Sequence, residues 1–148
     1  QTCALPISRI VSLYFDGRVQ SEALPKNAEA FAFGLQDLNA DLSPDYVYLS
    51  ANELQAVSQD GLSLFTHRFK DATHGMMQLF PMSEGRGKLG IVCPQANEVY
   101  LFSDDGSVTD GFPINGNTEM LLIPAVEGEK SILICGSADK KINCYSIE

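Results

Sequence analysis

The chain has 148 residues, of which 45% are hydrophobic and 20% are charged, and its formal net charge is −9. This composition allows a globular domain with a real core and excludes a disordered tail. It also excludes nucleic acid as a partner, because an acidic surface repels a phosphate backbone, and no run of about 18 apolar residues is present to span a membrane.

The first seven residues, QTCALPI, resemble a translated sequencing adapter. We therefore expect residues 1–7 to be an adapter-derived or disordered segment, with an ordinary N-terminal segment as the alternative. Under the adapter interpretation, the chain is the C-terminal part of a longer protein. Its N-terminal blades and any targeting signal then lie upstream.

Asp-Gly pairs recur along the chain at Asp16-Gly17, Asp60-Gly61 and Asp105-Gly106, which are 44 and 45 residues apart. Each pair lies between two runs of alternating apolar residues. An Asp-Gly pair in this setting predicts a β-hairpin with a type I′ turn. The near-constant spacing indicates a structural repeat.

The segments before each hairpin repeat as well. Residues 46–50, 89–93 and 132–136 are continuous apolar runs, which predict strands that are covered on both faces. Residues 31–35, 76–80 and 120–123 predict one further strand in each unit. Each unit thus has four strands in about 44 residues, the size of one propeller blade.

The predicted fold is all-β, a β-propeller fragment of four-stranded antiparallel blades. Residues 8–25 form part of a blade, residues 30–70 and 75–115 form whole blades, and residues 119–148 form an incomplete blade. A β-sandwich is the alternative for short strands with frequent turns, but a sandwich has no reason to repeat. The last blade is expected to lack its outer strand after Ile147, which leaves an unpaired edge and a tendency to associate.

One loop carries a pattern of oxygen side chains. Asp37, Asn39, Asp41 and Asp45 occupy positions 1, 3, 5 and 9 between two predicted strands. Ca²⁺ takes six to eight oxygen ligands, and alternate residues of a tight loop can converge on one point. The loop therefore predicts a metal site, with Ca²⁺ as the cofactor, and the alternative is a set of solvated turns.

This loop, with Phe33-Gly34 ahead of it and a strand behind, resembles the FG-GAP/VCBS repeat of integrin-type propellers and their bacterial relatives. The resemblance implies a fifth ligand, the carbonyl group of Ser43. The family has glycine where this chain has Leu42, and a left-handed leucine costs roughly 1 kcal/mol. Residues 82–85 and 125–128 keep only an acid followed by glycine, so they are expected to have lost the site.

The resemblance implies a non-enzymatic module that binds a protein or glycan on a loop face, in the periplasm or outside the cell. The alternative is the C-terminal part of a propeller enzyme, a quinoprotein-like dehydrogenase or a glycosidase, whose active site lies in the missing part. His67 and His74 have no partner at metal-ligand spacing and are expected to be surface residues. Cys135 and Cys144 flank one predicted hairpin, and their disulfide state stays open.

Overall fold

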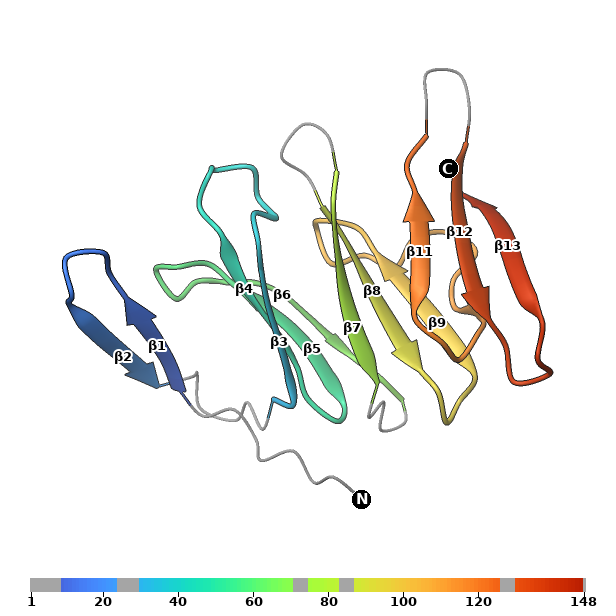
Figure 1. Cartoon of the computed structure of the whole chain (residues 1–148), viewed down its shortest axis with the longest axis horizontal. Coiled ribbons are helices and arrows are strands. Elements are labelled where there is room, and N and C mark those ends of the chain that lie inside the picture. Colours follow the sequence, from blue (N-terminus) through green and yellow to red (C-terminus); the bar gives the residue numbers. More distant parts are fainter. Residues whose placement is uncertain (1–8, 24–29, 71–74, 83–86, 126–129, 148) are drawn as a thin grey trace.

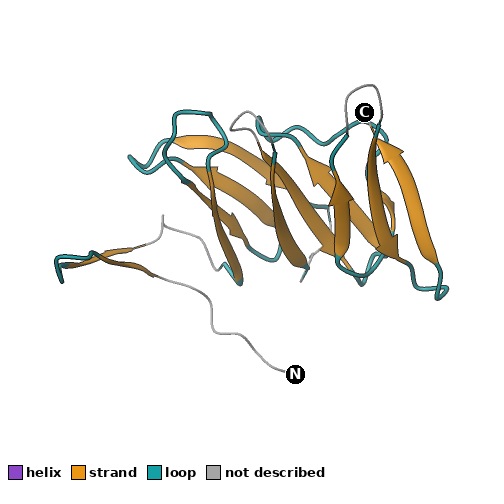
Figure 2. Ribbon diagram, turned by 45° about the horizontal axis from the view of Figure 1, so that its top comes forward, coloured by secondary structure: helices purple, strands orange, loops and turns teal. Residues whose placement is uncertain are grey.

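The structure is a computed structural model that describes residues 9–23, 30–70, 75–82, 87–125 and 130–147. Every regular element within these ranges is a β-strand, and none is a helix (Figure 2). The prediction of an all-β chain is confirmed. The same ranges contain no helix that is long and apolar enough to cross a membrane.

The described strands form four small antiparallel sheets, in which strands that follow one another in the chain pair with one another. The N-terminal hairpin consists of β1 (Arg9–Leu13) and β2 (Val19–Ala23). Sheet I consists of β3 (Ala32–Gln36), β4 (Asp45–Leu49), β5 (Glu53–Val57) and β6 (Ser63–Arg68). Sheet II consists of β7 (Met76–Pro81), β8 (Gly87–Cys93), β9 (Glu98–Phe102) and β10 (Ile114–Asn115). Sheet III consists of β11 (Met120–Ile123), β12 (Ser131–Gly136) and β13 (Ile142–Ile147).

The three larger sheets stand face to face in a row, with the N-terminal hairpin beside sheet I (Figure 1). The core between sheets I and II includes Val47, Leu49, Leu54, Leu89, Ile91 and Phe102. The core between sheets II and III includes Val92, Val99, Leu101, Met120, Leu122 and Leu133. Gly90 permits close packing at the second junction, since an added Cβ would lie 2.6 Å from the Sδ of Met120. Burial of these side chains is the main force that holds the row together.

The middle strands follow the predicted apolar runs, but they are not equally covered. Strands β4 and β8 are buried on both faces, as their continuous apolar sequences predict. Strand β12 has an equally apolar sequence, yet Ile132 is exposed and Ile134 is half-buried. The second face of sheet III has no neighbouring sheet among the described residues, which explains the difference.

The Asp-Gly hairpins form where they were predicted, with a different turn. At Gly17, Gly61 and Gly106 the φ angles are +85°, +86° and +80°, while the preceding aspartates have negative φ. The backbone N–H of Gly17 donates to the carbonyl of Tyr14 at 2.9 Å. This pattern is a three-residue loop that ends in a left-handed residue, and it replaces the expected type I′ turn. Lys140, with φ of +63°, closes the same kind of loop without glycine.

Candidate cation site

The loop between β3 and β4 holds all five residues of the predicted cation site. Asp45 is the first residue of β4 and is fully buried, Asp37 and Ser43 are half-buried, and Asn39 and Asp41 are exposed. Pairing of Gln36 with Asp45 at the end of the two strands places the loop's first and last carboxylates close to each other. The strands therefore position the two ends of the site.

Five hydrogen bonds fold the loop, and one of them runs from the backbone N–H of Asp41 to Oδ1 of Asn39 at 3.0 Å. The backbone N–H of Leu38 donates to Oδ2 of Asp45, and the N–H of Leu42 donates to Oδ2 of Asp37, both at 2.9 Å. Asp41 accepts two bonds, one from the Nδ2 of Asn39 at 2.9 Å and one from the backbone N–H of Ser43 at 2.7 Å. Side-chain oxygens thus replace the regular strand pairing within the loop.

Two carboxylate oxygens in the loop are buried without a hydrogen-bond partner among the described residues. They are Oδ1 of Asp37 and Oδ1 of Asp45. A buried charged oxygen without a partner is costly, so such groups normally coordinate a metal, bind water or take up a proton. The arrangement leaves two hard oxygen ligands unused, which is the donor chemistry that Ca²⁺ prefers.

The raised pKa of Asp45 also favours a bound cation in this loop. Burial raises the pKa of the Asp45 carboxyl group, and the negative charges of Asp41 and Asp37 raise it further, against the lowering effect of the backbone N–H of Leu38. Burial and the two neighbouring carboxylates thus disfavour the ionised form of Asp45. A cation would relieve that repulsion.

The backbone has the left-handed residue that the resemblance requires. Leu42 has a φ of +69°, and its side chain is 91% exposed. Ala40 is also left-handed, with a φ of +60°, which the sequence pattern did not indicate. The chain therefore adopts the turn at a residue that carries a steric penalty for it and gains no packing in return.

The loop does not gather every predicted ligand. Asn39 and Asp41 are bonded to each other at its exposed tip. No group of three or more His, Cys, Asp or Glu side chains within the described ranges has the arrangement of a metal site. The two segments predicted to have lost the site, 82–85 and 125–128, lie mostly outside the described residues.

A polar groove lies where sheets II and III meet, with a volume of about 590 Å³. Lys88, Ser103, Ser107, Thr109 and Lys130 are among the residues that line it. The hydroxyl oxygen of Thr109 is buried and has no hydrogen-bond partner in the described part of the chain. Sequence reasoning missed this groove, because its residues come mainly from β8, from β13 and from the loop after β9, and they carry no motif.

The histidine and cysteine residues considered in the sequence analysis belong to no site among the described residues. His67 is half-buried rather than a surface residue, since its ring lies 4.9 Å from that of Phe69 and 4.8 Å from that of Phe102. Burial lowers its pKa. Cys135 pairs with Asn143 and Cys144 with Ile134, so the two thiols lie on opposite faces of sheet III and cannot form a disulfide with each other. His74 lies outside the described residues.

Comparison with known proteins leaves the family open. No protein-family model and no curated protein matches the chain. Among solved structures, the chain is similar to a protein of unknown function from Bacteroides caccae, with 12% sequence identity and a TM-score of 0.48. The match covers 96% of this chain and 55% of that one, so the chain spans about half of that protein's length.

Proposed function

We propose that the chain is a run of β-propeller blades of the FG-GAP/VCBS type that binds or scaffolds other molecules and does not catalyse a reaction. The meander order of sheets I and II and their face-to-face stacking support this interpretation. So does the recurrence of one hairpin turn at intervals of 44 and 45 residues. In this proposal sheets I and II are whole blades, and the N-terminal hairpin and sheet III are partial ones.

The cation loop is the most specific part of the proposal, and Ca²⁺ is its cofactor. The observation that carries it is the fully buried Asp45, whose Oδ1 has no partner and whose neighbour Asp37 presents a second such oxygen. A bound ion would join the start and the end of the β3–β4 loop. Millimolar Ca²⁺ outside the cell or in the periplasm would keep even a weak site filled.

Melting curves with and without Ca²⁺ test this site. Ca²⁺ at ten times its dissociation constant stabilises the fold by about 1.4 kcal/mol, which raises the melting temperature by about 3–6 °C, and a chelator reverses the rise. Asp45→Asn removes the buried charge but keeps an acceptor for the N–H of Leu38. This variant should melt higher than the parent without Ca²⁺ and should no longer respond to it.

Glu119→Gln is the matched control, because it removes the same charge at an exposed position. It should keep the full response to Ca²⁺. If Ca²⁺ leaves the parent's melting curve unchanged, the loop is a set of turns and the cation proposal is wrong. A similar response in Asp45→Asn would place the ion elsewhere.

The ligand of the module is proposed to be a protein or a glycan. The groove between sheets II and III offers hydroxyl groups together with Lys88, Lys130 and Asp110, which suit the hydroxyl groups of sugars or the polar side chains of a polypeptide. An array of acidic and neutral oligosaccharides, probed with the parent chain and with Thr109→Val, tests the glycan option. Binding that Thr109→Val does not weaken would exclude this groove.

A further inference from the structure

Buried oxygen atoms without a partner gather at the base of the β3–β4 loop. Within the described residues, four buried side-chain polar atoms have no hydrogen-bond partner, and three of them are Oε1 of Gln36, Oδ1 of Asp37 and Oδ1 of Asp45. The fourth belongs to Thr109, in the groove between sheets II and III. Each such oxygen costs free energy unless a cation, a water molecule or a proton meets it. A single cation at the base of the loop would satisfy the first three together.

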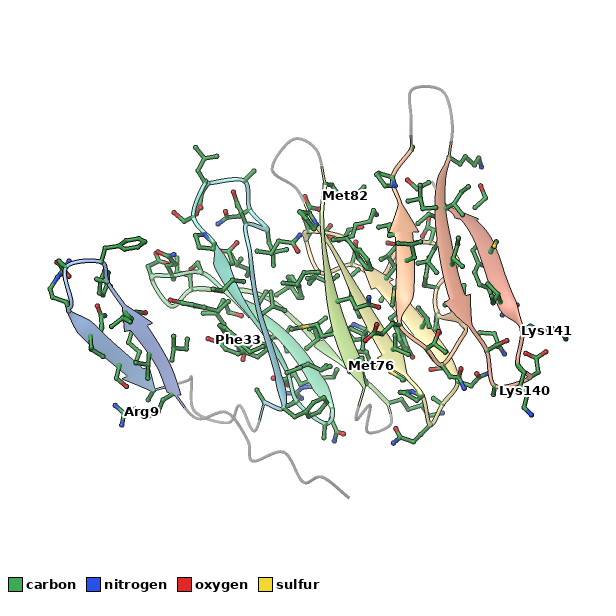
Figure 3. The ribbon with its side chains drawn as sticks, in the orientation of Figure 1. Arg9, Phe33, Met76, Met82, Lys140 and Lys141 are labelled. Carbon is green, nitrogen blue, oxygen red and sulfur yellow. The ribbon has the colours of Figure 1, made fainter. Side chains whose placement is uncertain are left out.

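The pairing of β3 with β4 places Gln36 and Asp45 on the same face of sheet I. The two residues are register partners, so their Cβ atoms lie about 4.5–5.5 Å apart. Val47, two residues after Asp45, packs in the core between sheets I and II, and side chains alternate along a strand. Gln36 and Asp45 therefore point toward sheet II. Phe33 lies on the other side of sheet I, toward the N-terminal hairpin (Figure 3).

Sheet II fixes the position of the Gln36 carboxamide. Its Nε2 donates to the carbonyl of Phe80 in β7 at 3.4 Å. A Cβ atom added to Gly87 would lie 1.0 Å from the same nitrogen, so glycine is needed there to leave room for the side chain. At the next junction, both polar atoms of the Gln78 carboxamide are bonded to the backbone of Met120. The oxygen of Gln36 has no such bond in the described part of the chain, and it can serve another partner.

We propose that Oε1 of Gln36 is a ligand of the cation that Asp45 binds, so that the ion lies at the base of the loop on the side of sheet II. This inference rests on the proposed cation site. A side-chain carbonyl is a ligand that Ca²⁺ accepts, and it supplies an oxygen without adding to the repulsion among the carboxylates. Gln36 thereby compensates for the tip of the loop, where Asn39 and Asp41 are bonded to each other.

The bound ion also strengthens the contact between sheets I and II. A cation at Oε1 of Gln36 polarises the carboxamide, which makes its Nε2 a stronger donor. The bond from Nε2 to the carbonyl of Phe80 is longer than an ordinary hydrogen bond at 3.4 Å, and it should shorten when the ion binds. Ca²⁺ thus tightens the junction between the two sheets.

Calcium titrations of two variants test whether Gln36 is a ligand. Gln36→Met keeps the length of the side chain and removes its oxygen. In isothermal titration calorimetry it should raise the Kd for Ca²⁺ at least about tenfold, because loss of even an outer partner of a metal ligand costs roughly 10–100-fold. Gln36→Glu keeps an oxygen at the same place but, when ionised, cannot donate to Phe80. It should bind Ca²⁺ at least as tightly as the parent.

Gln95→Met is the matched control, because it makes the same change at an exposed position between β8 and β9. It should bind Ca²⁺ like the parent. Equal affinity of Gln36→Met and the parent overturns this inference alone, whereas a parent that does not bind Ca²⁺ refutes the cation proposal with it. Weak binding by Gln36→Glu also overturns the inference, since the side chain would then act through Phe80 rather than as a ligand.

An NMR titration gives a second readout in the parent itself, which does not depend on the folding of any variant. The side-chain amide protons of Gln36 should move downfield when Ca²⁺ is added, because the ion polarises the carboxamide. Those of Gln95 should stay in place. Unshifted signals of Gln36 in the Ca²⁺-loaded parent would overturn the inference.

Discussion

Gln78 is expected to be one of the most important polar residues for stability, because its side chain joins sheets II and III. Its Nε2 donates to the carbonyl of Met120 at 3.0 Å, and the N–H of Met120 donates to its Oε1 at 2.7 Å. A carboxamide offers the same donor and acceptor as a peptide group, so Gln78 pairs with the inner edge of β11 as a strand would. Met120 is only 4% exposed, and water would not easily replace the lost bonds.

Gln78→Met keeps the length of the side chain and removes both bonds. Each bond contributes about 0.5–1.5 kcal/mol, and a buried backbone group left unpaired costs about 1–3 kcal/mol. We therefore expect a loss of about 2–4 kcal/mol in the free energy of unfolding. Urea denaturation followed by far-ultraviolet circular dichroism measures this loss, provided that the slopes of parent and variant agree.

Gln36 provides a matched comparison on sheet I. Its Nε2 donates to the carbonyl of Phe80 at 3.4 Å, longer than an ordinary hydrogen bond, and its Oε1 is buried without a partner in the described residues. Gln36→Met removes a weak bond together with an unsatisfied oxygen, so the change should stay within about 0.5 kcal/mol. Equal losses at the two positions, or a larger loss at Gln36, would refute the reasoning.

Three further changes test other parts of the structure. Leu42→Gly should stabilise the fold by about 0.5–1 kcal/mol, because glycine adopts a φ of +69° without a steric penalty and the side chain of Leu42 is 91% exposed. A lower melting temperature of the variant would contradict this. Burial lowers the pKa of His67 below 6.5, so the unfolded chain binds a proton more readily than the folded chain does. The free energy of unfolding should therefore fall as the pH drops below 6.5 toward the folded pKa. In the His67→Phe variant, the urea concentration at the midpoint of unfolding should depend less on pH in that window. An unchanged dependence on pH would argue against burial of His67 as the cause. Burial also raises the pKa of Cys93 to about 11, so peptide mapping after alkylation at pH 8 should find Cys144 modified and Cys93 protected until the chain unfolds.

The sequence by itself predicts the strands and where the hairpins lie. Alternation of side chains and the flexibility of glycine act over a few residues, so residues 9–23, 46–57 and 89–102 contain the strands that their patterns indicate, although the turn at Asp16-Gly17 is not of the predicted type. The oxygen-rich loop was also visible, because its residues are adjacent in the chain and the strands on both sides hold it.

Only the tertiary structure decided which faces are covered and which polar groups are satisfied. β8 and β12 have similar apolar sequences, yet β8 lies between two sheets and β12 has a sheet on one side only among the described residues. The register of sheet III placed Cys135 and Cys144 on opposite faces, and stacking brought Gln78 to the edge of β11. The stacking of sheets depends on contacts between residues tens of positions apart, which no local pattern encodes. The bond from Gln78 to Met120, for example, spans 42 positions.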